Sequence, residues 1–242
     1  MFSYRKINKV LLVLLHVVLQ FQEVQGGQVT DPHNPCRFIF KSEWEEKIQE
    51  FETSDLENAP QLGGVLFVGA STIRRWDLKK YFSSYPTINR GFGGSGIDDL
   101  ITYRERIITR YKPTVVIIKS GDNDIGKYAP QEIASHVLQL IRDIKQDLPR
   151  VRVGFISLTA APCFPKHVPL VLETNALLNE SLKDFSHVHF IDITNALNIN
   201  NRIDHRAAKS LFLGDRKHLN DQGYTIISSH VNAFLEKEYP SL

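Results

Sequence analysis

The stretch GVLFVGAST, residues 64–72, decides the fold of this chain. Residues 64–68 form a continuous apolar run of strand length flanked by glycines, which predicts a buried strand of a parallel sheet. Gly69 predicts a turn after this strand, and Ser71 follows two residues later. Because ligands of open parallel sheets bind at the carboxyl ends of the strands, Ser71 is well placed to act as a nucleophile. A helix-capping role for Ser71 is the alternative that this stretch alone leaves open.

Strand and helix patterns alternate along the rest of the chain. Further strands are expected at residues 87–90, 114–118, 151–158 and 188–193. Helices are expected after a capping box at residues 42–45, within the helix-and-loop segment 72–85, over 97–111, from Pro130 onward, over 170–185 and over 222–239. Alternating strands and helices predict right-handed crossovers and a parallel sheet covered on both faces. The sequence therefore predicts an α/β fold, a three-layer α/β/α domain of flavodoxin-like size with a five-stranded parallel sheet.

The first 26 residues have the pattern of a secretory signal peptide. Arg5, Lys6 and Lys9 precede an apolar run over residues 10–19, and residues 24–26 offer a cleavage site. This run is shorter than the roughly 20 apolar residues that a membrane-spanning helix needs. We therefore expect a secreted protein without a stable membrane anchor. Its N-terminal extension, with one helix, would cover residues 27–62, and a single domain would cover residues 63–242.

The charge of the chain argues against a nucleic-acid partner. The formal net charge is +2 at pH 7, and the expected leader contributes three basic residues and one acidic residue. Removal of the leader would therefore leave a neutral chain, which lacks the overall positive charge that attracts nucleic acids.

Two features of the sequence bear on a secreted location. Cys36 and Cys163 are the only cysteines, and an oxidising compartment favours a disulfide between them; two free buried thiols are the alternative. Asn179 begins the only Asn-x-Ser/Thr sequon and is a candidate glycosylation site.

Polar residues or glycines follow three of the expected strands, and a polar pair precedes the last helix. These are Ser71, the glycine-rich residues 91–96, Asn123, and the pair Asp215 and His218. Acyl transfer needs a nucleophile, a base that takes its proton and a group that orients the base, and Ser71, His218 and Asp215 are the candidates. The backbone N–H groups of Ser71 and Gly94, with the side-chain amide of Asn123, are candidate donors to the developing oxyanion.

Four short blocks, in this order, resemble those of the SGNH hydrolases, also called GDSL-type esterases. They are VGAS at 68–71, NRGFGG at 89–94, GDND at 121–124 and DRKHLN at 215–220. The resemblance extends from about Trp44 to the C-terminus and implies the flavodoxin-like SGNH hydrolase fold. It implies that Ser71 is the nucleophile, that His218 is the base and that Asp215 orients His218. Gly94 and Asn123 would complete the oxyanion hole, with Gly93 as the neighbouring alternative to Gly94.

The resemblance implies a serine esterase that hydrolyses carboxylic esters through an acyl-enzyme, without a metal or other cofactor. Acetyl or other short acyl groups on a carbohydrate or small alcohol are the first expectation. A lipid esterase that resembles lysophospholipases or platelet-activating-factor acetylhydrolases is the second. A non-catalytic secreted binding module on the same fold is a third reading, although binding would not require Ser71, Asn123, Asp215 and His218 together. The sequence does not indicate an oligomeric state.

One residue departs from the family pattern. The family has Asp between the glycine and the serine of the first block, whereas this chain has Ala70. We expect this change to alter the hydrogen bonds near Ser71 without removing the nucleophile.

Three other kinds of site fit the sequence less well. The nucleophile motif of α/β-hydrolases needs a glycine where Ile73 stands. Cys163 with His167 as a thiol catalyst lacks the flanking signatures. A metal site lacks the usual ligand spacing, although it could draw on Asp122, Asp124, His205, Asp215 and His218.

Two groups of residues are expected to be structural. His187 and His189 alternate along a strand and so share a face. Arg74, Arg75 and Trp76 are expected at a solvated helix start, with a place at the substrate entrance as the alternative.

Overall fold

The computed structural model describes residues 44–197 and 210–239 of the 242-residue chain. All of them belong to one compact unit, Ile39–Leu242. The expected signal peptide, the capping residue Ser42, Cys36 and His205 lie outside the described residues. The leader, the domain boundaries and the disulfide therefore stay predictions.

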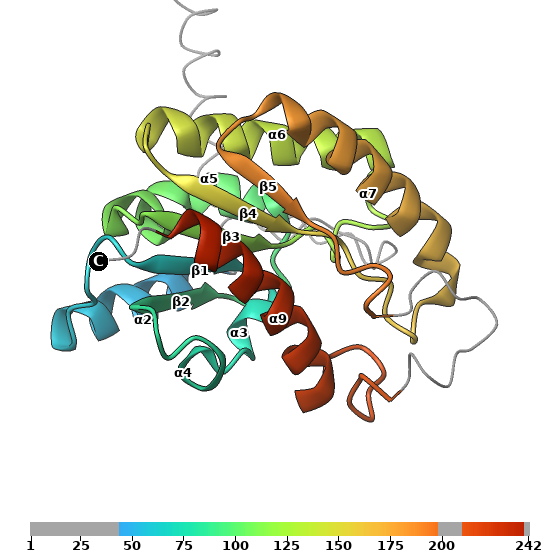
Figure 1. The fold of residues 1–242 in the computed structure, drawn as a ribbon, viewed down its shortest axis with the longest axis horizontal. Helices are drawn as coiled ribbons and strands as arrows, with labels where there is room; N and C mark the ends of the chain where they lie inside the picture. Colours follow the sequence, from blue (N-terminus) through green and yellow to red (C-terminus); the bar gives the residue numbers. More distant parts are fainter. Residues whose placement is uncertain (1–43, 198–209, 240–242) are drawn as a thin grey trace, which may run out of the picture. The chain divides into compact units, whose positions relative to one another are not determined.

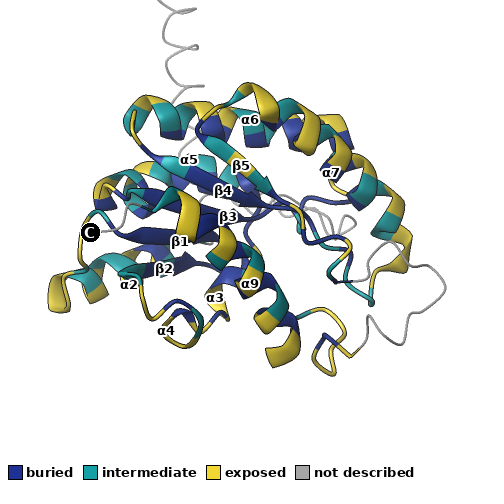
Figure 2. Cartoon of the chain, in the orientation of Figure 1, coloured by how far each residue is buried: buried dark blue, intermediate teal, exposed yellow. Residues whose placement is uncertain are grey.

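Five parallel strands form one sheet in the order β2-β1-β3-β4-β5 (Figure 1). The strands are β1 (Val65–Gly69), β2 (Thr87–Gly91), β3 (Val115–Lys119), β4 (Arg152–Ile156) and β5 (Val188–Ile191). Each bound lies within two residues of the predicted one. The central strands β1 and β3 are buried along their whole length, whereas the edge strands β2 and β5 are partly exposed (Figure 2). This burial explains the continuous apolar runs of β1 and β3.

Helices cover both faces of the sheet. They are α2 (Glu45–Glu57), α3 (Ser71–Arg74), α4 (Leu78–Tyr81), α5 (Ile97–Ile107), α6 (Pro130–Asp147), α7 (Val168–Ser181) and α9 (Asp221–Glu238), with short 3-10 helices η1 (Thr109–Tyr111), η2 (Pro165–His167) and η3 (Leu182–Asp184). Helices α5, α6 and α7 pack side by side on one face, and α3 and α9 lie on the other (Figure 1). This arrangement confirms the predicted three-layer α/β/α fold.

Helix α6 shows how the sequence builds these layers. Pro130 begins the helix, and the Glu132 carboxylate accepts a hydrogen bond from the Ala129 N–H, 2.9 Å away. Ile133, Val137, Leu140, Ile141 and Ile144 recur at helical spacing and are buried against the sheet and its neighbouring helices. Periodic burial of this kind supplies most of the stability of a surface helix.

Two predictions about helix starts are wrong in detail. Helix α2 begins at Glu45 with Trp44 as its N-cap residue, beyond the expected capping residue Ser42. Trp76 is only 3% exposed, so it belongs neither to a solvated helix start nor to an open entrance. The large ring fills the space between α9 and the sheet, where it meets Phe67 of β1 and Tyr224 of α9. Its indole N–H donates to the Ser228 hydroxyl of α9 at 3.0 Å, so the polar group of the buried ring has a partner.

Gly69 sets the direction of the chain where β1 ends. Its φ is +145°, and a Cβ at this position would lie 2.0 Å from the carbonyl oxygen of Lys119 on β3. Only glycine tolerates both the backbone conformation and this approach. The chain can therefore turn out of the sheet and place Ser71 at its carboxyl edge.

Candidate active site

Ser71 is the first residue of α3, and only Ala70 separates it from the last residue of β1, Gly69. It is half-buried, and its hydroxyl lies at the carboxyl edge of the sheet, where ligands of such folds bind. The neighbouring Thr72 carbonyl accepts a hydrogen bond from the Tyr224 hydroxyl of α9 at 2.9 Å. This bond ties the segment of Ser71, the candidate nucleophile, to the helix that follows Asp215 and His218.

A chain of hydrogen bonds joins Ser71, His218 and Asp215. The Nε2 atom of His218 lies 3.2 Å from the Ser71 Oγ, and its Nδ1 atom lies 2.6 Å from the Asp215 Oδ2. A carboxylate can only accept, so Nδ1 carries the proton that faces Asp215. In the neutral imidazole, the lone pair of Nε2 then faces the Ser71 hydroxyl, as a general base requires.

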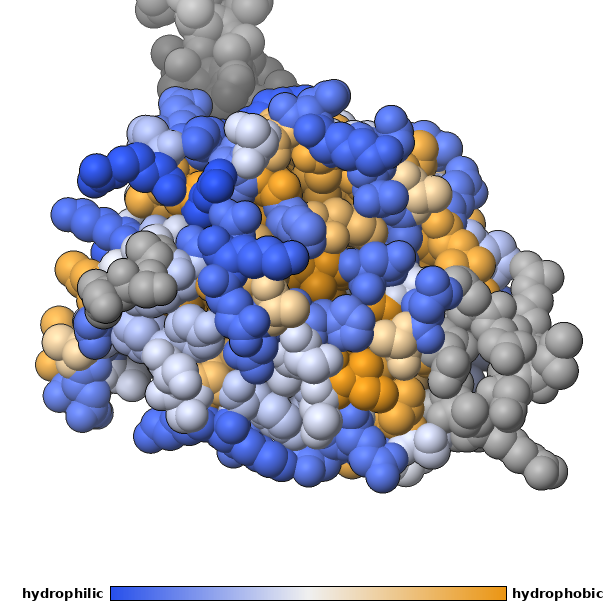
Figure 3. Space-filling view, viewed as in Figure 1, coloured by the Kyte–Doolittle hydropathy of each residue, from blue (hydrophilic) through white to orange (hydrophobic). Residues whose placement is uncertain are grey.

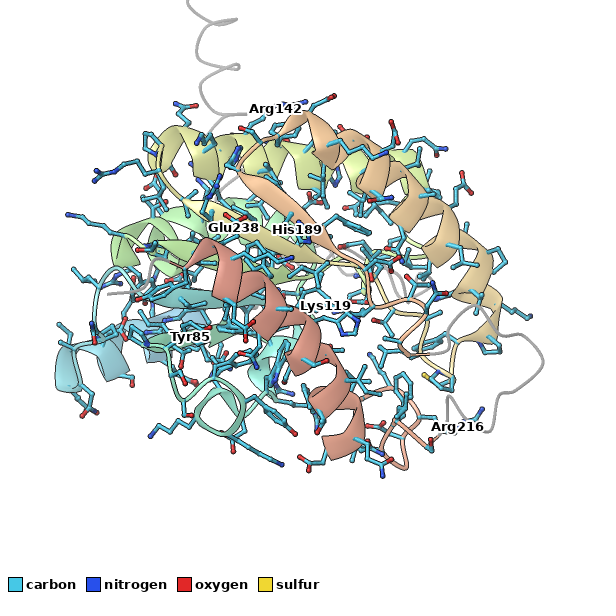
Figure 4. The ribbon with its side chains drawn as sticks, in the orientation of Figure 1. Tyr85, Lys119, Arg142, His189, Arg216 and Glu238 are labelled. Carbon is cyan, nitrogen blue, oxygen red and sulfur yellow. The ribbon has the colours of Figure 1, made fainter. Side chains whose placement is uncertain are left out.

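A tight turn over residues 213–218 presents both partners of Ser71. The Leu213 N–H donates to the His218 carbonyl at 2.7 Å, and the Arg216 N–H donates to the Leu213 carbonyl at 2.8 Å. Arg216 itself has the left-handed φ of +57°, and Figure 4 shows it beyond the N-terminal end of α9. The turn therefore fixes the spacing of Asp215 and His218 before the helix begins.

The surroundings of Asp215 keep its carboxyl group ionised. Hydrogen bonds from the His218 ring and from the backbone N–H groups of His218 and Lys217 lower the pKa of this carboxyl far below its usual range. The Asp215 side chain is 45% exposed, whereas the His218 side chain is 16% exposed. An ionised carboxylate that accepts from Nδ1–H can orient the base and stabilise the imidazolium that forms in catalysis.

Asn123 lies beside Ser71 in the wall of the same cavity. Its Nδ2 atom donates to the carbonyl oxygen of Ser95 at 3.0 Å. Only the nitrogen of the amide can face a carbonyl oxygen, so this contact fixes the orientation of the side chain. The second N–H of the amide stays available to an oxyanion.

Gly94 lies on the loop between β2 and α5, which Asn123 contacts through Ser95. Its φ of +93° lies in the left-handed region that favours glycine. Gly94 is exposed, and within the described part of the chain it is not among the residues that line the cavity beside Ser71. Its role as an oxyanion donor, with Gly93 as the alternative, stays a prediction.

A cavity of about 170 Å³ adjoins Ser71 and Asn123. Most of its wall comes from small or apolar side chains that follow β1 and β4 or lie near His218. The wall consists of Ala70, Ser71, Thr72, Asp122, Asn123, Ile125, Thr159, Ala160, Ala161, Phe164, His167, Val171, Phe212, Lys217 and Leu219. Such a cavity is smaller than the roughly 300–1,000 Å³ that drug-sized ligands fill, so it fits a small group beside the Ser71 hydroxyl.

Comparison with known proteins decides the family. The model of the GDSL-like Lipase/Acylhydrolase family matches residues 70–226. The chain belongs to the GDSL-like lipase/acylhydrolase family. It is therefore an ester hydrolase by family, and its substrate is an ester. A comparison with curated proteins finds no match.

Solved structures show that this GDSL-like acylhydrolase shares its fold with distant proteins. A protein from Streptococcus pneumoniae described as a platelet activating factor has 21% identity and a TM-score of 0.69, over 78% of this chain and 92% of that chain. A GDSL-like lipase from Bacteroides thetaiotaomicron has 17% identity and a TM-score of 0.64, over 78% and 97%. An acetylxylan esterase from Geobacillus stearothermophilus has 15% identity and a TM-score of 0.56, over 75% and 97%.

Ala70, which departs from the pattern of the GDSL-type family, is 5% exposed. Its N–H donates to the Lys119 carbonyl at 3.2 Å, and its carbonyl accepts from the Arg74 N–H at 3.0 Å. The buried methyl group of Ala70 needs no hydrogen-bond partner, and main-chain bonds hold the backbone of residue 70.

An ion pair between the buried Lys119 and Asp122 of the cavity wall was not predicted from the sequence. Lys119 is 1% exposed and lies in the interior (Figure 4), where its Nζ bonds to the Asp122 carboxylate. The other Asp122 oxygen accepts from the Thr159 N–H at 2.6 Å. The only sequence signal is a lysine that ends an apolar strand, followed by an aspartate three residues later.

The two histidines that were expected to be structural, and His167 of the less favoured thiol site, have aromatic partners. His189 stacks on Phe234 of α9 at 5.5 Å, and His187 contacts Phe185; both histidines lie at the start of β5, at the opposite end of the sheet from Ser71. His167 stacks on Phe164 in the cavity wall. Within residues 44–197 and 210–239, no cluster of three potential ligands could hold a metal ion.

The buried carboxyl group of Asp124, next to Asn123, should make the free energy of unfolding depend on pH. Burial raises its pKa to about 6, while its Oδ2 accepts from the Ile97 N–H at 3.0 Å. The unfolded value is about 3.9, so the folded state binds more protons between these values. This carboxyl therefore lowers the free energy of unfolding as the pH rises from about 4 to about 6. A pKa difference of about 2 corresponds to at most about 3 kcal/mol.

Asp124→Asn keeps an oxygen that can accept from Ile97 but carries no charge. We expect the Tm of the variant minus the Tm of wild type to increase from pH 4 to pH 7. The increase should be about 2–4 °C for each kcal/mol by which the Asp124 carboxylate lowers the free energy of unfolding of the wild type. Calorimetry of both proteins at the two pH values measures this change. A difference in Tm that stays the same at both would contradict the account of Asp124.

Proposed function

We propose that this GDSL-like acylhydrolase is a secreted serine esterase that removes acetyl or other short acyl groups from a carbohydrate or small alcohol. The observation that carries the proposal is the chain from Asp215 through His218 to Ser71, beside a cavity of about 170 Å³. The leader pattern of residues 1–26 supports secretion. Asn179, the sequon residue, lies exposed on α7 and stays a candidate glycosylation site.

In this mechanism, His218 Nε2 takes the proton of Ser71 as the Ser71 Oγ attacks the carbonyl carbon of the ester. The Asn123 amide and the backbone N–H groups of Ser71 and Gly94 stabilise the oxyanion. The bond to the alcohol breaks as His218 returns the proton to the leaving oxygen. A water molecule then attacks the acyl-enzyme by the same route, which releases the carboxylic acid and regenerates Ser71.

Phe164 favours a second candidate for the alcohol. Its ring lines the cavity and is 44% exposed, so it could contact the apolar part of a lipid alcohol. A lysophospholipase or platelet-activating-factor-acetylhydrolase-like activity is therefore the second candidate.

Among the described residues, no helix is long and apolar enough to cross a bilayer. Hydrophilic residues cover much of the face in Figure 3, with smaller apolar areas between them.

A series of nitrophenyl esters from acetate to dodecanoate tests the acyl preference. Because misfit of a single methylene costs about tenfold or more, kcat/KM should be highest for acetate or butyrate and fall steeply at octanoate. Ser71→Ala protein serves as the blank. Acetylated oligosaccharides and lysophospholipids, compared at equal concentration, then identify the alcohol. Rates that rise steadily to dodecanoate would contradict the short-acyl proposal, and no hydrolysis of any ester would favour a binding module.

A further inference from the structure

The indole of Trp44 lies against the glycine loop, residues 91–96, that leads from β2 into α5. A Cβ built on Gly94 would lie 3.0 Å from the Cη2 atom of this indole. The same ring meets Phe92 edge to face, with 5.6 Å between ring centroids. Trp44 therefore contacts the loop at Gly94 itself and at the residue two places before it.

Trp44 also holds the far side of the loop through Asp99. Its indole N–H donates to the Asp99 carboxylate. The Asp99 Oδ2 accepts from the Gly96 N–H at 2.8 Å. The backbone on both sides of Gly94 is thus connected to one side chain.

Helix α2, which carries Trp44, is fixed to the rest of the unit along its length. Arg106 of α5 bonds to Glu45 at 2.9 Å and to Glu52 at 2.6 Å. Near its C-terminal end, Asp55 pairs with Arg90 of β2, and both side chains are about nine-tenths buried. Each partly exposed pair contributes little alone, but together with the buried pair they hold the helix in place. The helix is therefore anchored, and the bond to Asp99 and the contact with Phe92 hold the indole against the loop.

Asn123 of the candidate active site and Arg74 of α3 contact the same loop from elsewhere. The Asn123 amide donates to the Ser95 carbonyl, and a Cβ on Gly93 would lie 3.0 Å from the guanidinium of Arg74. Glycines at positions 91, 93, 94 and 96 would otherwise leave this loop with much conformational freedom. Donors to an oxyanion act by being fixed before the reaction, so this freedom must be removed.

We propose that Trp44 is a positioning residue for the oxyanion hole, which fixes the peptide of Gly94 so that its N–H faces the oxyanion on Ser71. The inference rests on the proposed function, because it assumes that Gly94 donates to the oxyanion. Trp44 precedes residue 70, where the match to the family model begins. Trp44, at the start of a helix outside the matched region, would thus fix part of the oxyanion hole.

The test compares two truncations on the same helix. Trp44→Ala removes the indole, and we expect kcat to fall about tenfold to 10²-fold with little change in KM, since a misplaced donor weakens the transition state alone. Ile48→Ala is the matched control, because Ile48 is fully buried on α2 and is not among the nearest neighbours of the loop glycines. It should lower Tm at least as much as Trp44→Ala and leave kcat unchanged well below Tm. Trp44→Phe retains a ring at Gly94 without the N–H and should lose less activity than Trp44→Ala.

A second measurement separates this inference from the proposed function. Hydrogen exchange of the amides at residues 93–96 should be faster in Trp44→Ala than in Ile48→Ala, whether or not the ester assay succeeds. Faster exchange in a protein whose wild type hydrolyses no ester would support the role of Trp44 in fixing the loop and would reject the esterase function. An unchanged kcat in Trp44→Ala, or an equal loss in Ile48→Ala, would overturn the positioning role. If Trp44→Ala does not fold, Trp44→Phe and Trp44→Leu are measured in the same way, and wild-type kcat in both would overturn it.

Discussion

Replacement of Ser71 by alanine is expected to lower kcat about 10⁶-fold, the loss found when the nucleophile of a serine hydrolase is removed. The expectation follows from the 3.2 Å contact between the Ser71 Oγ and the His218 Nε2, beside a cavity that can hold the acyl group. Stopped assays with nitrophenyl acetate at high enzyme concentration measure the residual rate.

Ser229→Ala is the matched control for Ser71→Ala. It makes the same chemical change on α9, where the Ser229 hydroxyl, among the residues that the structure describes, bonds only to Ile226 and His230 of its own helix. We expect this variant to retain wild-type kcat. A folded Ser71→Ala protein with more than about one hundredth of wild-type kcat would mean that another group is the nucleophile, because that loss is far smaller than removal of a nucleophile causes.

His218→Gln is expected to cost nearly as much as Ser71→Ala, because the base and the nucleophile act as a unit. His218 must be neutral to accept the Ser71 proton, so kcat/KM of the wild type should fall on acidification. The pH profile of kcat/KM measures this acid limb, which should disappear from the residual activity of His218→Gln. If the limb persists in that variant, another residue is the base.

Asp215→Asn should cost less, about 10⁴-fold in kcat, because Asp215 orients the imidazole without taking the proton. Asp221→Asn makes the same change six residues later, on a carboxylate that bonds to Lys80 and Tyr81 instead. This control should retain wild-type kcat. A loss in Asp215→Asn equal to that in Ser71→Ala, in a protein that is still folded, would give Asp215 a larger role than orientation.

The sheet could be predicted from the sequence because its central strands are buried on both faces. The apolar runs at residues 64–68 and 114–118 are too short for a typical helix and are rich in β-branched residues, which favours a buried strand. The candidate site could be predicted for a related reason. Parallel strands end at one edge, so Ser71 and Asn123, which follow different strands, were expected to meet there.

Other features depend on contacts that a sequence pattern does not contain. Trp44 fits an amphipathic helix equally well whether its ring packs on the core or on the glycine loop. Trp76 follows two arginines, and this polar neighbourhood gave no sign of the space between α9 and the sheet that its ring fills. The pairing of Lys119 with Asp122 needs the turn after β3 to bring a buried ammonium to the cavity wall.

The central claim is that Ser71 forms the covalent acyl-enzyme. A fluorophosphonate reacts with an activated serine and stays attached to it, so the labelled peptide identifies the nucleophile directly. Wild-type protein should gain one label, on the peptide that contains Ser71, and neither Ser71→Ala nor His218→Gln should be labelled at a comparable rate. Label on a different peptide, or equal labelling of Ser71→Ala, would contradict the claim.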